Sequence, residues 1–266
     1  MAKPLLPDEL WIRIEPLLPP EPPKPKGGRP RVDSRMALTG ILFVLKTGCP
    51  WEYLPKEMGC GSGMTCWRRL RDWHEAGVWA RIHQVLLDEL GQDERIDWAR
   101  ASLDSSSNPG KKGGPETGPN PTDRGKLGTK HHILVDGQGI PLAAMIGPAN
   151  QHDSMALEPL LDRVRPVRGQ RGRPRKRPDK LHADKGYDYR RCRLACRRRR
   201  IQPRIARRGV DSKERLGKHR WVVERSIAWI HVHRRLAMRW ERRADIHEAF
   251  LHIACALVCL NHLLGG

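Results

Sequence analysis

The segment KLHADKGYD, from Lys180 to Asp188, carries the pattern on which the fold prediction depends. A short apolar run ends at Asp184 and is followed by a glycine, so we predict a strand over 180–184. A basic stretch with apolar residues at helical spacing follows and predicts a helix near 188–199, and a further short strand is expected at 201–205. Strand, helix and strand in this order indicate a mixed α/β class.

The flanking segments extend this pattern. Upstream, short apolar runs separated by turns predict a meander of strands at 100–105, 130–135 and 140–147, followed by a helix at about 154–164. Downstream, we expect a long helix from about 216 to 238 and a last apolar helix from Ile246 to Leu264. Three strands, helix, strand, helix, strand, helix is the element order of the ribonuclease-H-like fold, although periodicity alone does not select that fold.

Three acidic residues stand where a shared site can form in such a fold. Asp104 is expected at the end of the first strand, Asp184 at the end of the fourth, and Glu224 in the long helix. Ligands bind beyond the carboxyl ends of adjacent strands, so the two aspartates can converge there. Phosphodiester transfer uses two divalent cations about 3.5–4 Å apart. Oxygen ligands favour Mg²⁺ or Mn²⁺, and without cations the carboxylates repel, so we expect a weakly formed site.

Each acid also has an ordinary structural interpretation. An aspartate at a strand end is commonly a turn former, and Glu224 beside Arg220 could be a surface ion pair worth about 0.3–0.5 kcal/mol. Three other acids compete for the ligand role but fall in turns or loops: Asp136, Asp153 and Asp188. We expect weaker DNA-positioning roles for Lys130, Lys185 and Tyr187, and core or supporting roles rather than metal ligation for His131, His132 and His182.

The charge of the chain indicates a polyanionic partner. Lys and Arg number 50 against 30 Asp and Glu, a net charge of +20, and Arg165 to Arg208 holds 19 basic residues against three aspartates. Double-stranded DNA is favoured over a membrane surface, because no window offers about 18 uncharged apolar residues in succession. Since Asp184 lies inside the basic stretch, we predict a DNA-contacting surface there rather than a solvated face or a disordered tail.

Two short segments resemble AT-hooks. RGRPRKRP, from Arg171 to Pro178, would lay Arg171, Arg173 and Arg175 into a narrow A·T-rich minor groove, and GRPR recurs at Gly28 to Arg31. Both could equally be ordinary linkers whose prolines and glycines prevent regular structure.

The chain is expected to divide near residue 95 into an N-terminal helical domain, 1–95, and a catalytic domain, 96–266. A helix at 34–46 with Ser34 as its N-cap, a short helix at 51–58, the turn GCGSG and a helix at 64–76 form a helix-turn-helix pattern. We predict DNA contacts from the last of these helices, at Arg68, Arg69 and Arg71. A small helical bundle that packs against the rest is the alternative.

The N-terminus has no apolar run of signal-peptide length, so we expect a cytoplasmic, nucleoid-associated protein without disulfides. Cys192 with Cys196, and Cys255 with Cys259, are four apart and lack the CxxC spacing of a zinc site.

Across nearly its whole length the chain resembles bacterial insertion-sequence transposases of the DDE class, close to the group numbered five. The resemblance rests on LPDELWIRIEPLLP, TGCPWEYLP, LDSSS, GPNPTDRGKLGTKHHILVD, NQHDS, HADKGYD and RWVVERSIAWIHVHRRL. It implies a ribonuclease-H-like core, Asp104, Asp184 and Glu224 as ligands of a pair of Mg²⁺ or Mn²⁺ ions, and action on the inverted repeats of an element.

The family's C-terminal signature of Tyr, Arg, Glu and Lys falls here on Gly217, Arg220, Glu224 and His231, so two of the four positions depart from it. Arg220, Glu224 and His231 still share one helical face, and we expect Arg220 and His231 to contact DNA or phosphate.

The predicted function is cleavage of element ends and in-line attack of the freed 3′ hydroxyl on target DNA. Synapsis of two ends implies a homodimer or higher oligomer during the reaction. A non-catalytic DNA-binding remnant or repressor and a hydrolysis-only metal-dependent nuclease are the alternatives, with an interaction protein for acidic partners third.

Overall fold

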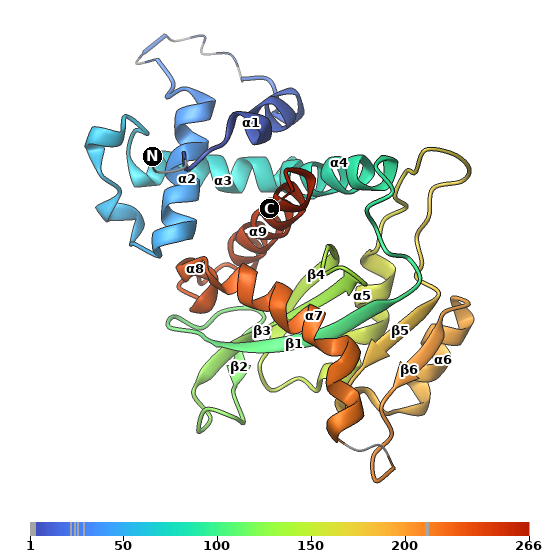
Figure 1. Cartoon of the computed structure of the whole chain (residues 1–266). Helices are drawn as coiled ribbons and strands as arrows, with labels where there is room; N and C mark the ends of the chain where they lie inside the picture. The colour runs from blue at the N-terminus through green and yellow to red at the C-terminus, as the bar shows by residue number, and fades with distance from the viewer. Residues whose placement is uncertain are drawn as a thin grey trace.

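The computed structural model describes residues 4–21, 23, 25, 27, 28, 30–210 and 213–265, and the side chains of all of these except 213–220. Figure 1 shows a helical N-terminal part beside an α/β part, with the C-terminal helix lying between the two. The predicted α/β class with an N-terminal helical region is confirmed.

The N-terminal part contains four α-helices and three short 3₁₀ turns among the described residues. They are α1 (Asp8–Ile14), η1 (Glu15–Leu17), α2 (Ser34–Thr47), η2 (Trp51–Tyr53), η3 (Lys56–Met58), α3 (Gly63–Glu75) and α4 (Val78–Gln92). The expected N-cap Ser34 is wrong by one residue, because the side chain of Asp33 accepts the Met36 amide at 3.0 Å. The expected helix at 51–58 is two 3₁₀ turns, each preceded by a proline in extended backbone, Pro50 and Pro55.

The sheet has the strand order of the predicted fold. Its strands are β1 (Ala101–Pro109), β2 (Gly118–Pro119), β3 (Leu127–Asp136), β4 (Pro141–Pro148), β5 (Lys180–Ala183) and β6 (Gln202–Ile205). β4, β3 and β1 form an antiparallel meander, while β5 pairs in parallel with β1 and β6 in parallel with β5. β2 extends the outer edge of β3 beside β4. The order β4-β3-β1-β5-β6 is that of a ribonuclease-H-like sheet.

Helices cover both faces of this sheet (Figure 1). They are α5 (Leu157–Arg163), α6 (Arg190–Arg198), α7 (Lys213–His231), α8 (Arg234–Ala237) and α9 (Ala244–Leu263), with 3₁₀ turns η4 (Asp153–Met155) and η5 (Lys185–Tyr187). α7 packs across β1, β3 and β5, whereas α5 packs on β4 and β3 and contacts α6. The helix expected over 216–238 ends at His231, because His233 adopts extended backbone before α8 begins.

α9 joins the two parts of the molecule. Its side chains pack against α4, α3, α7 and β4, so the hydrophobic core is continuous across the boundary expected near residue 95. α9 is long and apolar enough to cross a membrane, but 67% of its most apolar stretch is buried inside the protein. This burial is typical of a core helix.

Candidate active site and nucleic-acid interface

Asp104 lies in β1, and Asp184 directly follows the neighbouring strand β5. The parallel register of β1 and β5 pairs Ala101 with Leu181 and Ser102 with His182, so each aspartate follows its paired residue by two positions. Backbones of adjacent strands are about 5 Å apart. Asp104 was expected at the end of its strand, but β1 continues to Pro109 along β3. Asp104 instead stands where the pairing of β1 with β5 ends.

Local hydrogen bonds orient the two carboxylates. Asp184 is the N-cap of η5, and its Oδ1 accepts the Gly186 amide at 2.8 Å. Oδ1 of Asp104 accepts the amide of Ser105 at 2.8 Å. The half-buried position of both side chains leaves them accessible at the edge where β5 ends.

Tyr187 shows that the acids share one environment. Its side chain is buried, and burial raises its pKa well above the ordinary value, with the negative charges of Asp153, Asp104 and Asp184 adding to the shift. The phenol therefore stays protonated at any physiological pH. Asp153 thus lies near the two aspartates, although its Oδ1 is paired with Lys130 Nζ at 2.8 Å.

Glu224 approaches from the helix that crosses the sheet. The buried face of α7 includes Val222, Val223, Ser226 and Ile230, and Ser226 Oγ donates to Gly139 O at 2.7 Å. Glu224 lies off this face and is exposed. Within the described residues, no three His, Cys, Asp or Glu side chains are grouped so that they could hold a metal ion. The strand register therefore brings Asp104 and Asp184 close together, and Glu224 lies on α7, which packs across β1 and β5. Their role as metal ligands stays a prediction.

The other two competing acids have structural partners. Asp136 is buried and accepts the amides of Asp97, Gln138 and Ile140 at 2.8–2.9 Å, while burial raises its pKa to about 6. Asp188 pairs with Arg193 at 2.6 Å and accepts the Arg208 amide at 2.9 Å. Both carboxylates stabilise backbone turns or side chains.

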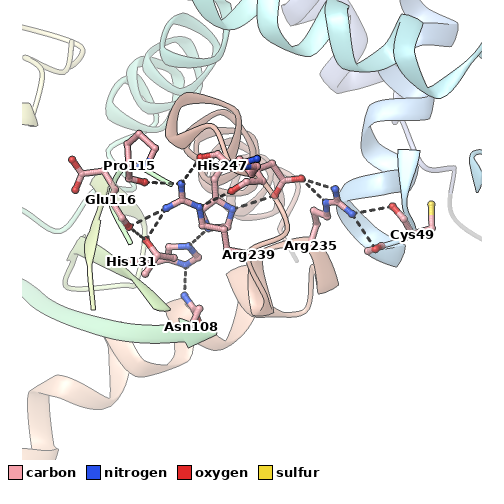
Figure 2. A network of polar contacts seen from close by, with 12 residues as sticks. Cys49, Asn108, Pro115, Glu116, His131, Arg235, Arg239 and His247 are labelled. Atoms are coloured by element: carbon pink, nitrogen blue, oxygen red, sulfur yellow. Dashed lines mark hydrogen bonds and ion pairs between the residues drawn. The ribbon is translucent and has the colours of Figure 1, made fainter. Parts of the chain in front are cut away.

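A buried polar network connects β3 to α7 and α9 (Figure 2). His131 Nδ1 lies 3.0 Å from the Asn108 amide nitrogen and 3.2 Å from His231 Nε2, and His131 Nε2 lies 2.8 Å from His247 Nε2. Because the Asn108 amide donates, His131 Nδ1 accepts and its Nε2 donates. His247 then carries its proton on Nδ1, 3.6 Å from the Glu241 carboxylate.

His231 is part of this network, which was not foreseen. Burial lowers its pKa, and the nearby His247 lowers it further, so the imidazole is neutral at pH 7. His131 and His132 are buried, in accordance with the core roles expected for them, and His247 is buried as well. The DNA contact of His231 stays a prediction, and Arg220 lies outside the residues whose side chains are described.

The candidate DNA-binding arginines differ in how their charge is used. Arg171 and Arg173 are exposed in the loop between α5 and β5, whose sides are joined by a bridge between Val167 and Arg175. Arg175 is paired with Asp179 at 2.7 Å and lies over the Trp98 ring. Lys185 directly follows Asp184 and is half-buried.

In the helix-turn-helix-like part, too, some arginines are exposed and others are paired with a carboxylate. Arg68 is exposed beside a groove of about 740 Å³ that Arg31, Lys56 and Ser62 also line. Arg69 pairs with Glu21 at 2.9 Å, and Arg71 pairs with Asp72 at 2.6 Å. Of the three predicted DNA contacts in α3, Arg68 has the most accessible charge.

Sequence reasoning missed one group of residues beside the site: Ser154, Tyr189, Arg191 and Arg208. They lie close together through contacts between segments far apart in the chain. The density of arginines was the only available signal, and it does not distinguish one arginine from another.

The sheet order and its helices define an α/β protein of the ribonuclease-H-like class. Residues 96–259 match the family described as "Transposase DDE domain", and residues 6–83 match the transposases of the IS4/5 family (DUF4096). The chain therefore belongs to the DDE transposases of the IS4/5 group, which are metal-dependent polynucleotidyl transferases.

Curated relatives agree with this membership. The chain is 54% identical over 151 residues to a protein from Burkholderia cepacia named "Putative transposase for insertion sequence element IS402", covering 57% of this chain and 72% of that protein. It is 63% identical over 111 residues to a 16.2 kDa protein of the same element, covering 40% of this chain and 74% of that protein. A solved Mos1 transposase paired-end complex is 12% identical, with a TM-score of 0.25 over 90% of this chain and 82% of that one.

Proposed function

We propose that this transposase binds the terminal inverted repeats of an insertion sequence and catalyses DNA cleavage and strand transfer by two-metal phosphoryl transfer. Asp104 and Asp184 would hold the cations, and Glu224 would complete the site. The observation that carries this proposal is the matched position of Asp104 in β1 and Asp184 directly after the adjacent parallel strand β5, where α7, the helix that carries Glu224, packs on both strands. Their hard oxygen donors fit Mg²⁺ or Mn²⁺.

The bound cations would polarise the phosphoryl oxygens and activate the attacking oxygen. The protein's own contribution is to hold the carboxylates and to position DNA. Without cations the three carboxylates would repel one another, and bound positive charge would hold them together. Exposed arginines would hold the phosphate backbone, and two copies of the chain would be needed to synapse two ends.

A strand-transfer assay tests this proposal. The full chain is incubated with Mg²⁺, a labelled duplex that carries the element's terminal repeat, and an unlabelled target duplex. We expect the wild type to cut the labelled duplex and join its 3′ end to the target, which a hydrolysis-only nuclease does not do. Asp184→Asn should abolish cutting and change end binding by less than about threefold, a small free-energy difference.

Asp93→Asn is the matched control. Asp93 is exposed at the end of α4, away from the site, and the substitution removes the same charge. If Asp184→Asn cuts as fast as Asp93→Asn, Asp184 is not a ligand. The lack of a three-ligand group in the described part of the chain favours a second candidate, a remnant that binds ends without cutting. Wild-type protein that binds the repeat but never cuts it would support that candidate.

A further inference from the structure

The guanidinium groups of two arginines, Arg191 and Arg208, lie over the aromatic ring of Tyr189. Tyr189 is the N-cap residue of α6, directly after the loop that contains Asp184. The guanidinium carbon of Arg191 lies 4.6 Å from the ring centroid, and that of Arg208 lies 4.9 Å from it. Cations over an aromatic face are attracted by the ring quadrupole. We call these three residues the arginine–tyrosine clamp.

Neutral groups fix both guanidinium groups in place. Arg208 donates from Nε to the carbonyl oxygen of Lys185 at 3.0 Å and from Nη2 to the Tyr189 hydroxyl at 3.3 Å. Arg191 donates from Nη2 to Ser154 Oγ at 2.5 Å. Both arginines are nevertheless exposed. Within the part of the chain that the structure describes, no ion pair joins either guanidinium group to a carboxylate, although the charge of Asp188, which accepts the Arg208 backbone amide, acts on Arg208.

Neighbouring arginines are held differently. Arg193, on the same helix, pairs with Asp188 at 2.6 Å, and Arg199, just beyond it, pairs with Asp162 at 2.6 Å and with Glu158 at 3.1 Å. Those charges are satisfied inside the protein. Arg191 and Arg208 instead present preorganised forks, which suit the planar, bidentate recognition of a phosphate.

The clamp adjoins the acidic site through short connections. Arg208 bonds the carbonyl of Lys185, the residue after Asp184, and its backbone amide is accepted by Asp188. Ser154 follows Asp153, whose charge acts on Tyr187 together with the charges of Asp104 and Asp184. A strand whose phosphate sits on the clamp would thus have its next phosphates near the carboxylates.

We propose that the arginine–tyrosine clamp grips the backbone of the DNA strand that enters the acidic site, so that Arg191 and Arg208 are positioning residues for the scissile phosphate. The inference rests on the proposed function and adds the residues that set the position of its substrate. Tyr189 acts through the two arginines, because its ring holds them in one geometry.

The test compares two pairs of substitutions with the same loss of charge. Arg191→Ala with Arg208→Ala removes the clamp, whereas Arg197→Ala with Arg198→Ala removes two exposed arginines of α6 for which the described structure shows no side-chain contact. Cleavage of the terminal-repeat duplex is measured with Mg²⁺ at saturating DNA, and the Kd is measured separately. We expect both pairs to weaken binding similarly, but the clamp pair to lower the saturated cleavage rate about 10- to 100-fold and the control pair by less than about threefold.

Variants of Tyr189 separate positioning from charge. Tyr189→Phe keeps the ring and should retain most of the rate. Tyr189→Leu removes the ring, leaves both arginines, and should lower the saturated rate toward that of the clamp pair with little change in Kd. Circular dichroism and the melting temperature of each variant show whether it folds, and Tyr189→Phe serves as the comparison if Tyr189→Leu does not.

Two outcomes overturn the inference. If the control pair slows cleavage as much as the clamp pair, only net charge matters, while cutting by the wild type leaves the proposed function intact. If the wild type does not cut, the proposed function fails and the clamp has no scissile phosphate to position, so the inference fails with it. The wild-type control therefore distinguishes this outcome from the first.

Discussion

Asp104, in β1, and Asp184, directly after the parallel strand β5, each lie two residues beyond the paired Ser102 and His182. This register brings two carboxylates to the same edge of the sheet from positions 80 residues apart in the chain. Two like charges on adjacent strands repel, and a divalent cation between them would replace that repulsion by attraction.

The first prediction concerns metal binding and stability. Mg²⁺ or Mn²⁺ should raise the melting temperature of the wild type, because a ligand that binds only the folded state stabilises it. Asp184→Asn should abolish this rise. In the presence of a chelator the same variant should melt at or above the wild-type temperature, because one of the two repelling charges is gone. Differential scanning calorimetry at fixed ionic strength measures both effects.

Asp93→Asn again provides the matched control, with an expected metal response equal to that of the wild type. A metal-induced rise that persists in Asp184→Asn would mean that the cation binds elsewhere. A variant that melts far below the wild type in chelator would show a structural role for Asp184, through its bond to the Gly186 amide.

Much of the sheet was predictable because its signals are local. The apolar run of β3 and the short run before Asp184 identify strands from side-chain pattern alone. β1 was underestimated, because its second half is the polar run Ser105–Asn108, which is held in the sheet by pairing with β3. α4 was missed although Val78, Ile82, Leu86 and Leu90 repeat at helical spacing, so the signal was present.

Side-chain partners were not predictable, because they depend on residues far away in the sequence. Arg69 looked like a free recognition residue, but Glu21 pairs with it from a segment 48 residues earlier. His231 looked like a surface contact, but it faces His131, 100 residues earlier. A sequence pattern shows which residue types gather on one face of a helix. Only the fold shows which distant side chain neutralises or buries a particular residue.

The second prediction is a loss of stability in mild acid. Burial lowers the pKa of His83 and of His132 to about 4, whereas an unfolded histidine titrates near 6.5. As the pH falls from 6.5 to 4, the unfolded state gains protons that the folded state does not, so stability falls. Asp136, with a folded pKa of about 6, acts in the opposite direction over part of this range.

Urea unfolding at pH 7.5 and pH 5.0 measures this effect. The free energy of unfolding should be lower at pH 5.0 by roughly 2 kcal/mol for each of His83 and His132, less about 1 kcal/mol for Asp136. Burial also lowers the pKa of His233 to about 4 and that of His252 to about 3, so these two imidazoles should add to the fall. His132→Gln should reduce the pH dependence by about one proton. Equal stability at the two pH values would show that these imidazoles are protonated in the folded protein.

The third prediction concerns the buried ion pair of Arg235 and Glu241. Arg235 Nε donates to Glu241 Oε1 at 2.7 Å, and the two side chains are only 6% and 3% exposed. Burial alone would raise the pKa of Glu241, but the His247 ring, whose Nδ1 lies 3.6 Å from the carboxylate, and the charge of Arg235 outweigh it and lower that pKa. Arg235 also donates to the carbonyls of Gly48 and Cys49, beyond α2, so the pair links the two parts of the molecule (Figure 2).

Glu241→Gln should lower the free energy of unfolding by about 3–5 kcal/mol, because it leaves a buried positive charge uncompensated. Arg235→Met combined with Glu241→Leu should cost less than the sum of the two single changes, since neither charge is then left alone. Arg163→Ala is the control: it breaks the more exposed pair with Glu248 and should cost about 0–1 kcal/mol. Additive single and double changes would mean that the two side chains do not interact in solution.

The last prediction separates free from neutralised arginines in DNA binding. Arg171 and Arg173 are exposed in the loop between α5 and β5, and the described structure shows no side-chain partner for either. Arg199 is paired with Asp162 and Glu158. If Arg171 and Arg173 each contact one phosphate, replacing both by alanine should weaken binding to any duplex and make the slope of log Kobs against log salt less steep by about 2, because each phosphate contact releases about 0.9 counterion.

Arg199→Ala should leave that slope unchanged, because its charge is already balanced within the protein and releases no counterion from DNA. Fluorescence anisotropy with one duplex over a series of salt concentrations measures all three slopes. An A·T-rich and a G·C-rich duplex of equal length then test how the loop binds. A loss confined to the A·T-rich duplex would support minor-groove insertion of an AT-hook, whereas an equal loss on both would mean that the loop contacts the phosphate backbone without reading the sequence.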